Sequence, residues 1–502
     1  MNTKWGVLLC YNITMKSVSR WVEFVCFCFA LCIAAIMLIL RLNGMDAPFI
    51  YDEIFSWVTA DPAHPFGQVW REVLRADVNV PLFNLILRAW AYVVPMTRVW
   101  MRVIPVLFSL LTPVCAWWLA PKTWTYTQKI TFCTLLCASF PLTLFSAVLR
   151  TYSLAVLLVC IFTLLALQIV QAFIAGQNAS KSMWLGFGLA GVLACYSHYF
   201  AAALFFITAL FVLFASFYYK KQCLWAVGVA VAVGVVWLLW AGPVIYSLFG
   251  GSGTGGGDWW FKKGKMLASW EILEFLFGPS PVKLSLLGFL VVGMTSFCFE
   301  ERPLFENRPE IWLALLQIVG LCGAVGVISF RYNLFIERYF LMILPAVLLF
   351  FTGLLMHLQT RWKGVLVLLP LFAGVNMVCF LKIYQLHPTD MSGLTEVFSY
   401  VSHTLQRKEV LVLFDRMTYP GPSARWTLEY FLPQDVSLTL TPLTRENVSR
   451  MQPPESVPLV APLSSFMHVM QFSQKYGFDS GSNLRRFKQA CLVRTLPDVN
   501  KG

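Results

Sequence analysis

The stretch PFIYDEIFSW, residues 48–57, sets two adjacent acids, Asp52 and Glu53, among aromatic and aliphatic side chains. It comes shortly after residues 23–40, an apolar segment of the length that crosses a bilayer. Acids that follow a span lie where the chain leaves the membrane. Such a pair indicates a solvated loop, a cap for the following helix, or a functional site at the membrane surface.

The composition is that of a membrane protein with many spans. The chain has 502 residues, of which 58% are hydrophobic and 13% charged, whereas about a quarter of the residues of a soluble domain are charged. Apolar runs of span length predict about eleven transmembrane helices. The expected spans are residues 23–40, 99–119, 130–148, 152–174, 184–199, 200–218, 224–246, 283–299, 311–329, 339–357 and 364–384.

The net charge of +13 does not by itself indicate a nucleic-acid partner, and we expect none. In a membrane protein, surplus Lys and Arg lie at the membrane edges and face anionic lipid. Most of the 14 cysteines lie inside apolar runs, where Cys behaves as a small apolar residue. We therefore expect neither a disulfide framework nor a cysteine metal site.

Basic loops predict the orientation of the chain. The loops at residues 121–129, 181 and 220–221 fall on one side of the eleven-span arrangement, which the positive-inside rule makes cytoplasmic. The first loop on the other side, residues 41–98, then lies outside the cytoplasm together with residues 386–502. We take the membrane to be a bacterial inner membrane.

Residues 80–95, VPLFNLILRAWAYVVP, are apolar but too short for a span, and Arg88 lies in the middle. Asn84 and Arg88 are four residues apart and so share one helical face. These features predict a helix that lies in the membrane interface, with Arg88 extending to lipid headgroups.

Two domains are expected. Residues 1–385 form the transmembrane domain, and its first outer loop, residues 41–98, holds interfacial helices. Residues 386–502 have another pattern, in which short apolar runs such as EVLVLFD and VSLTLTP alternate with helix-like stretches. This alternation predicts a small extracytoplasmic α/β domain.

Three arginines, Arg102, Arg150 and Arg338, lie at outer helix ends, against the positive-inside bias. A charge costs about 2.5–3.5 kcal/mol at mid-bilayer and less toward the interface. Each arginine could simply anchor a helix end, and Arg338 could pair with Glu337 or Asp46. Together with the acid pair, the three arginines also form a candidate site.

Six segments occur in an order that resembles the GT-C fold glycosyltransferases: YDEIFSW, DVNVPLFNLILRAW, VWMRVIPVL, RTYSL, YSHYF and ERYFLMILP. That family uses polyprenyl-phosphate sugars and includes protein O-mannosyltransferases and the bacterial enzyme that adds aminoarabinose to lipid A. The resemblance covers about residues 20–385. No single motif is specific to the family, and the resemblance depends on the ordered set. It implies the polytopic helical GT-C fold.

The resemblance assigns the catalytic acids to Asp52 and Glu53. A family pattern of Asp-x-His-Pro-Pro-Leu reads here from Asp77 to Leu82, with Asn79 in the place of the histidine, and an amide cannot act as a base. Asp77 could equally cap the following helix. The residues predicted to bind substrate are Asp77, Asn79, Arg102, Arg150, Tyr152, His198, Tyr199, Arg331 and Arg338.

The chemistry needs these residue types. A departing phosphate gains negative charge, which the planar guanidinium of arginine stabilises through paired hydrogen bonds. A carboxylate in an apolar setting is a stronger base, so Asp52 suits removal of the proton from an acceptor hydroxyl. The expected reaction moves a sugar from a polyprenyl-phosphate donor to a glycan, lipid or protein acceptor, with inversion. The sequence leaves metal use open: Asp52, Glu53 and Asp77 could hold a divalent cation, although relatives with monophosphate donors need none.

Two other classes of protein stay open. A transporter or flippase of lipid-linked precursors should have broken helices or polar groups at mid-membrane, and the predicted spans are nearly free of charge there. A non-catalytic scaffold that binds lipid phosphate is the third interpretation. His198 could instead have a purely structural role, as a packed histidine at a helix hairpin.

Overall fold

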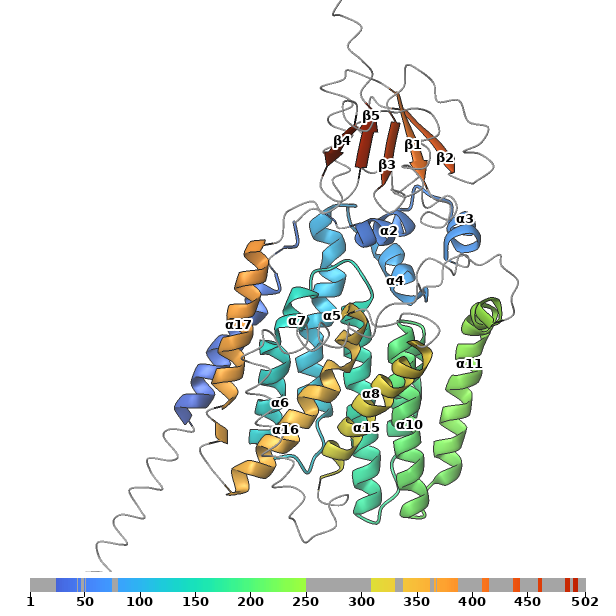
Figure 1. Cartoon of the computed structure of the whole chain (residues 1–502). Helices are drawn as coiled ribbons and strands as arrows, with labels where there is room; N and C mark the ends of the chain where they lie inside the picture. Colours follow the sequence, from blue (N-terminus) through green and yellow to red (C-terminus); the bar gives the residue numbers. More distant parts are fainter. Residues whose placement is uncertain are drawn as a thin grey trace, which may run out of the picture.

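The computed structural model describes most of the helical part of the chain and the strands that follow it (Figure 1). The described residues are 24–42, 44–46, 49, 51–74, 80–249, 308–329, 337–361, 365–366, 368–386, 409–414, 437–442, 459–462, 484–487 and 491–494. The expected span at residues 283–299 lies outside them, as do the helix-like stretches predicted after residue 386.

A first helix, Phe24–Leu40, leads to a group of short elements at one end of a helical bundle (Figure 1). These short elements are α2 (Tyr51–Ala60), α3 (Phe66–Gln68), the π-helical η1 (Val69–Leu74) and α4 (Leu82–Ala91). The bundle elements are α5 (Arg98–Leu119), α6 (Tyr126–Ala138), α7 (Phe140–Leu144), α8 (Tyr152–Ile174), α9 (Lys181–Cys195), α10 (Tyr199–Tyr218), α11 (Cys223–Phe249), α15 (Pro309–Ser329), the 3-10 helix η2 (Glu337–Ile343), α16 (Leu344–Arg361) and α17 (Leu368–Leu386).

Within the described residues, six helices are long and apolar enough to cross a membrane: α5, α8, α10, α11, α15 and the segment Arg338–Gln359. The first helix, α9 and α17 are apolar but shorter by the same measure. Each expected span apart from residues 283–299 coincides with helical structure. The prediction of a polytopic helical membrane protein is confirmed.

The centre of the bundle is α8, which is apolar on every face and buried along almost its whole length, as expected of a helix enclosed by others. Phe162 of α8 packs edge-on against Phe205 of α10, with ring centres 5.6 Å apart. Gly191 of α9 permits this packing, because a Cβ there would lie 2.2 Å from the ring of Phe205. By contrast, α11 lies at the edge of the bundle and exposes much of its apolar surface (Figure 1).

A polar group links three helices in the middle of the bundle. The amide of Gln317 in α15 donates to the hydroxyl oxygens of Thr163 in α8 (2.9 Å) and Thr208 in α10 (2.7 Å). Small polar side chains of this kind join helices in the membrane, where the hydrophobic effect does not drive association. This uncharged network agrees with the prediction that mid-span positions carry almost no charge.

The expected span at residues 130–148 is broken. Helix α6 ends at Ala138, Ser139 is extended (φ −65°, ψ 119°), and α7 starts at Phe140. Pro141 explains the break, because proline has no N–H with which to continue the helix. Beyond α7 the chain turns through residues 145–151 before α8 begins.

Both sides of this break are capped by distant side chains. Arg41 donates to the carbonyl oxygens of Leu136 (2.7 Å) and Cys137 (3.2 Å) at the end of α6. The N–H of Phe140 donates to the amide oxygen of Asn376 in α17 (2.8 Å). The break is therefore a fixed bend, with its exposed peptide groups satisfied.

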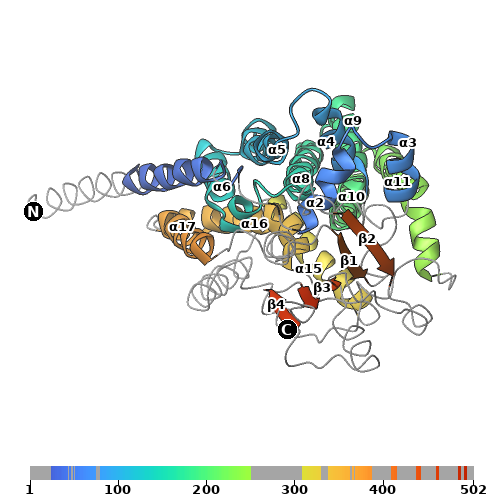
Figure 2. The same ribbon diagram turned by 90° about the horizontal axis from the view of Figure 1, so that it is seen from above.

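The first helix and α17 pack together at one edge of the bundle (Figures 1 and 2). Ile33 and Met37 of the first helix join Ala373 and Phe380 of α17 in one buried cluster. This contact brings the beginning and the end of the helical part side by side.

The C-terminal strands form a five-stranded mixed sheet in the order β2-β1-β3-β5-β4. Strand β1 pairs in parallel with β2 and β3, whereas β5 pairs antiparallel with β3 and β4. The predicted runs EVLVLFD and VSLTLTP contain β1 and β2, and the sheet lies at the end of the bundle that carries α2 to α4 (Figure 1). The strands are β1 (Glu409–Phe414), β2 (Ser437–Pro442), β3 (Leu459–Pro462), β4 (Leu484–Phe487) and β5 (Cys491–Arg494).

Candidate functional site

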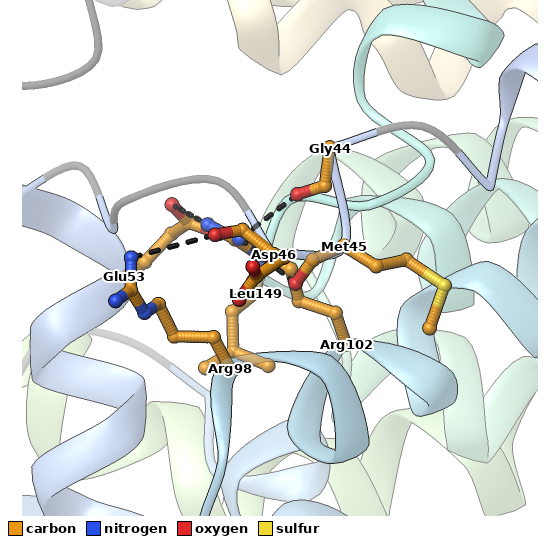
Figure 3. A network of polar contacts seen from close by, with 7 residues as sticks. All are labelled: Gly44, Met45, Asp46, Glu53, Arg98, Arg102 and Leu149. Carbon is orange, nitrogen blue, oxygen red and sulfur yellow. Dashed lines mark hydrogen bonds and ion pairs between the residues drawn. The ribbon is translucent and has the colours of Figure 1, made fainter.

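The acid pair lies in the first turn of α2, which begins at Tyr51. Glu53 is only 2% exposed and forms an ion pair with Arg102 of α5, which is 3% exposed. Nε and Nη2 of Arg102 donate to Oε1 of Glu53 (3.2 and 3.1 Å), and Nη2 also donates to Oε2 (3.0 Å), as Figure 3 shows. Two ionic side chains so deeply buried are tolerated because each satisfies the other.

The remaining hydrogen-bonding groups of the pair fix the surrounding chain (Figure 3). Nη1 of Arg102 donates to the carbonyl oxygens of Gly44 (2.9 Å) and Met45 (3.2 Å). Oε1 of Glu53 accepts the N–H of Leu149 at 2.7 Å. The pair therefore joins the chain that follows the first helix, at Gly44 and Met45, to α2, α5 and the turn before α8.

The turn before α8 places Arg150 beside α2. Arg150 directly follows the anchored Leu149, and its guanidinium carbon lies 5.9 Å from the ring centre of Phe55. Position 55 comes three residues, about one helical turn, after position 52. Arg150 therefore lies about one helical turn from position 52 of α2.

His198 lies where three further elements meet. It is the N-cap of α10, and its Nδ1 accepts the N–H of Phe200 at 3.1 Å, so the neutral ring carries its proton on Nε2. Its ring centre lies 6.3 Å from that of Tyr152 in α8 and 5.2 Å from that of Tyr339 in η2. The guanidinium of Arg338 lies 5.8 Å from the ring of Tyr339.

Burial, together with the positive charges of Arg150 and Arg338, lowers the pKa of His198 to about 3. The imidazole is therefore neutral at physiological pH. Both guanidinium groups act on one ring, so Arg150 and Arg338 both lie near His198. We call Arg150, His198 and Arg338 the cationic cluster.

Two hydrogen bonds hold the turn that carries His198. The hydroxyl of Thr151 donates to the carbonyl oxygen of Ser197 at 2.8 Å, and the N–H of Leu82 donates to the carbonyl oxygen of Tyr196 at 3.1 Å. The starts of α4, α8 and α10 are thereby joined. Asp77 and Asn79 precede Leu82 in the sequence but lie outside the described residues.

The structure brings together segments that are far apart in the chain. The predicted residues Arg150, Tyr152, His198 and Arg338 gather at the starts of α8, α10 and η2, and Arg150 also lies beside Phe55 of α2. Tyr199 follows His198 as the first residue of α10. Asp52 is placed by its backbone in the first turn of α2, and its side chain lies outside the described part of the structure. The residues of the predicted set that fall wholly outside it are Asp77, Asn79 and Arg331.

Metal binding stays a prediction. Among the side chains that the structure describes, no three His, Cys, Asp or Glu residues are grouped so that they could hold a metal ion. Two of the three residues named for a divalent cation, Asp52 and Asp77, have side chains outside that set. The third, Glu53, is bound to Arg102.

Arg88 is a residue whose place the sequence interpretation missed. It was expected to extend to headgroups, but it is 4% exposed. The buried residues of α4 include Phe83, Leu87 and Ala91, and Arg88 lies next to this stripe. The signal in the sequence was the spacing of Asn84 and Arg88, four residues apart. It places Arg88 close to the packed face of an amphipathic helix.

No protein-family model matches the sequence, and no curated protein is similar to it in sequence. Among solved structures, the chain is similar to ArnT from Cupriavidus metallidurans in the apo state, with a TM-score of 0.58 and 10% identity over 95% of this chain and 98% of ArnT. ArnT bound to undecaprenyl phosphate gives a TM-score of 0.44 and 10% identity over 93% and 98%. The oligosaccharyltransferase of Archaeoglobus fulgidus gives 0.45 and 11% over 82% and 60%.

The match to apo ArnT extends over nearly the full length of both chains and shows a common fold. ArnT, the lipid A aminoarabinose transferase, has the GT-C fold. The resemblance to GT-C fold proteins that the ordered segments indicated is therefore confirmed at the level of fold.

Proposed function

We propose that the chain is an integral membrane glycosyltransferase that moves one sugar from a polyprenyl-phosphate donor to an acceptor outside the cytoplasm. The observation that carries this proposal is the cationic cluster, whose Arg150 lies beside Phe55 of α2, the helix that has Asp52 in its first turn. Arginine side chains only donate hydrogen bonds, and Nε2 of His198 does the same because Nδ1 is engaged. Three donors with two positive charges suit an anion rich in acceptor oxygens, such as a phosphate.

The proposed reaction is a direct displacement. Asp52 takes the proton of the acceptor hydroxyl, and the hydroxyl oxygen forms a bond to the anomeric carbon of the donor sugar. The bond from that carbon to the phosphate oxygen breaks, and its electron pair stays on the polyprenyl phosphate. Arg150 and Arg338 stabilise the negative charge that the phosphate gains. Attack opposite to the leaving group inverts the anomeric configuration.

Within this proposal, Glu53 and Arg102 are positioning residues. Both oxygens of Glu53 accept hydrogen bonds from Arg102, and Oε1 also accepts from Leu149. A carboxylate so engaged is poorly placed to accept a proton from an acceptor, and Arg102 is equally committed to protein groups. We therefore revise the earlier roles: Asp52 is the base, and Glu53 with Arg102 sets the position of α2.

Two further points support the proposal without deciding the substrate. ArnT, whose fold the chain has, also has a structure bound to undecaprenyl phosphate. The connections that carry Lys181, Lys220 and Lys221 lie at the end of the bundle opposite to α2 (Figure 1). By the positive-inside rule, that arrangement supports a site outside the cytoplasm. The acceptor would be a glycan, a lipid or a protein there.

A transporter or flippase of lipid-linked precursors is the second candidate, and the break between α6 and α7 favours it, since transporters use broken helices. In transporters the freed peptide groups bind the substrate or coupling ion. Here Arg41 and Asn376 take up peptide groups at the break. The break therefore has fewer peptide groups left to bind a transported solute, whereas the cationic cluster has donors that suit a phosphate.

Purified protein in nanodiscs should be incubated with a panel of polyprenyl-phosphate sugars, with release of polyprenyl phosphate as the signal. Asp52→Asn should abolish release while the variant stays folded. Asp61→Asn is the matched control, because the carboxylate of Asp61 accepts a local N–H, that of Ala63 (2.8 Å), in the turn after α2, and an amide oxygen can accept the same hydrogen bond. Consumption of no donor, or an undiminished rate in Asp52→Asn, would overturn the proposal. Movement of intact donor across the bilayer would favour the transporter.

A further inference from the structure

Arg88 of α4 binds the far end of α2. Its Nη1 donates to the carbonyl oxygen of Thr59, in the last turn of α2, at 3.2 Å, and to that of Asp61 at 3.1 Å. Its Nη2 donates to the carbonyl oxygen of His64 at 2.6 Å. A positive charge at this position also meets the negative end of the helix dipole. One guanidinium thus closes the end of α2 and the turn that follows it.

The guanidinium of Arg88 is enclosed by rings. It lies 5.6 Å from the ring centre of Phe66 and 5.8 Å from that of Tyr92. With 4% of the residue exposed, its hydrogen bonds are little weakened by water. A lysine ammonium is a single compact charge and could not reach three carbonyl oxygens in the same geometry.

Helix α2 is therefore held at both ends by buried arginines from two other helices. Arg102 of α5 binds Glu53 in its first turn, and Arg88 of α4 binds its last turn and the residues beyond it. Between them, Ile54 and Val58 are buried against the core. A helix of ten residues is too short to persist without such contacts.

We propose that Arg88 is a positioning residue that fixes the orientation of α2, and through α2 the position of Asp52 relative to the cationic cluster. The hold on α2 is a property of the structure alone. Its effect on reaction rate rests on the proposed glycosyltransferase function. A displacement of about 1 Å of a reacting group can cost about 10²-fold in rate, so a small rotation of α2 should be visible in catalysis.

Hydrogen–deuterium exchange of the full-length protein in nanodiscs tests the hold on α2. In Arg88→Gln, amides of residues 51–64 should exchange at least about tenfold faster than in the unsubstituted protein, because charge-assisted hydrogen bonds to carbonyls are lost. Arg71→Gln removes the same charge from an exposed side chain of the same outer loop and should leave exchange of α2 unchanged. Unchanged exchange of α2 in Arg88→Gln would overturn the inference.

Kinetics with the consumed donor test the effect on Asp52. We expect Arg88→Gln to lower kcat by about 10²-fold with a nearly unchanged KM for the donor, Arg88→Lys to lie between, and Arg71→Gln to match the unsubstituted protein. Faster exchange of α2 with an unchanged kcat would overturn the positioning role.

If Arg88→Gln does not accumulate as folded protein, both measurements should be made on Arg88→Lys. If the unsubstituted protein consumes no donor, the proposed function fails, and the exchange result alone supports or overturns the hold on α2.

Discussion

Two arginines beside α2, Arg102 and Arg150, have opposite surroundings. Arg102 meets a carboxylate and two backbone carbonyls, and its charge is balanced within the protein. Arg150 lies against an aromatic ring and shares a neutral histidine with a second arginine, Arg338. The first arrangement lowers the free energy of the folded chain by itself. The second brings two guanidinium groups near one histidine, a setting that favours an arriving anion.

The comparison separates two kinds of arginine that look alike in sequence. Both lie at outer helix ends and both match segments of the GT-C resemblance. Their neighbours differ: a buried carboxylate holds Arg102, whereas an aromatic ring and His198 lie beside Arg150. We therefore expect changes at Arg102 to affect folding first and changes at Arg150 to affect activity first.

The largest effect is expected for Arg102→Ala. It would leave the carboxylate of Glu53 buried without its partner, which typically costs about 3–5 kcal/mol of stability. The variant should accumulate poorly and unfold at a lower temperature, measured by thermal unfolding in detergent. The double variant Glu53→Gln with Arg102→Gln should recover part of the loss, since no charge is then stranded. A double variant as unstable as Arg102→Ala would contradict this account of the pair.

Arg150→Gln and Arg338→Gln should show the reverse pattern. Each removes one donor from the proposed phosphate site, and loss of such a group typically lowers kcat by about 10²–10³-fold. The melting temperature should fall much less than in Arg102→Ala, because Arg150 and Arg338 are only partly buried, whereas Arg102 is fully buried. Release of polyprenyl phosphate and thermal unfolding should be measured on the same preparations. Strong destabilisation with intact activity would reverse the assignment of the two arginines.

The sequence predicted the helical framework well, because long apolar runs have few alternatives to a membrane helix. It also placed Arg102, Arg150 and Arg338 at one end of the bundle. The sequence could not predict the ion pair of Glu53 with Arg102, because two adjacent acids give no sign of which one is buried. The assignment of Glu53 as a catalytic acid came from the GT-C resemblance, which gives the acidic pair as a unit and does not distinguish its two members.

Contacts to the backbone were equally hidden. Arg88 binds carbonyl oxygens of Thr59, Asp61 and His64, and every residue has a carbonyl, so no residue type marks the partner. The break at Ser139 was signalled by Pro141, yet its cap, Asn376, lies 236 residues from Phe140 in the sequence. Local patterns predict where a helix can stop, whereas the distant cap that stabilises the stop depends on the completed fold.

A smaller effect, on pH dependence, follows from His198. Its pKa is about 3 in the folded chain and about 6.5 in an unfolded one. Between these values the unfolded chain binds more protons, so stability falls as pH drops below about 6.5, by at most about 1.4 kcal/mol per pH unit. Melting temperatures at about pH 7 and pH 5 should therefore differ more in the unsubstituted protein than in His198→Gln. Equal differences would mean that His198 is not held neutral between the two arginines.

The smallest effect concerns the hydrogen bond between Thr151 and Ser197, which joins the chain beside Arg150 to the chain beside His198. Thr151→Val removes the hydroxyl that donates to the carbonyl oxygen of Ser197, and a hydrogen bond of this kind contributes about 1 kcal/mol. Arg150 and His198 would then be less firmly held relative to each other, so kcat should fall modestly while Arg102 and Glu53 stay paired. Thr151→Ser keeps the hydroxyl and should behave as the unsubstituted protein in both thermal unfolding and donor turnover. If Thr151→Val instead destabilises the chain as much as Arg102→Ala, the cluster is part of the structural frame, and the distinction between the two arginines is lost.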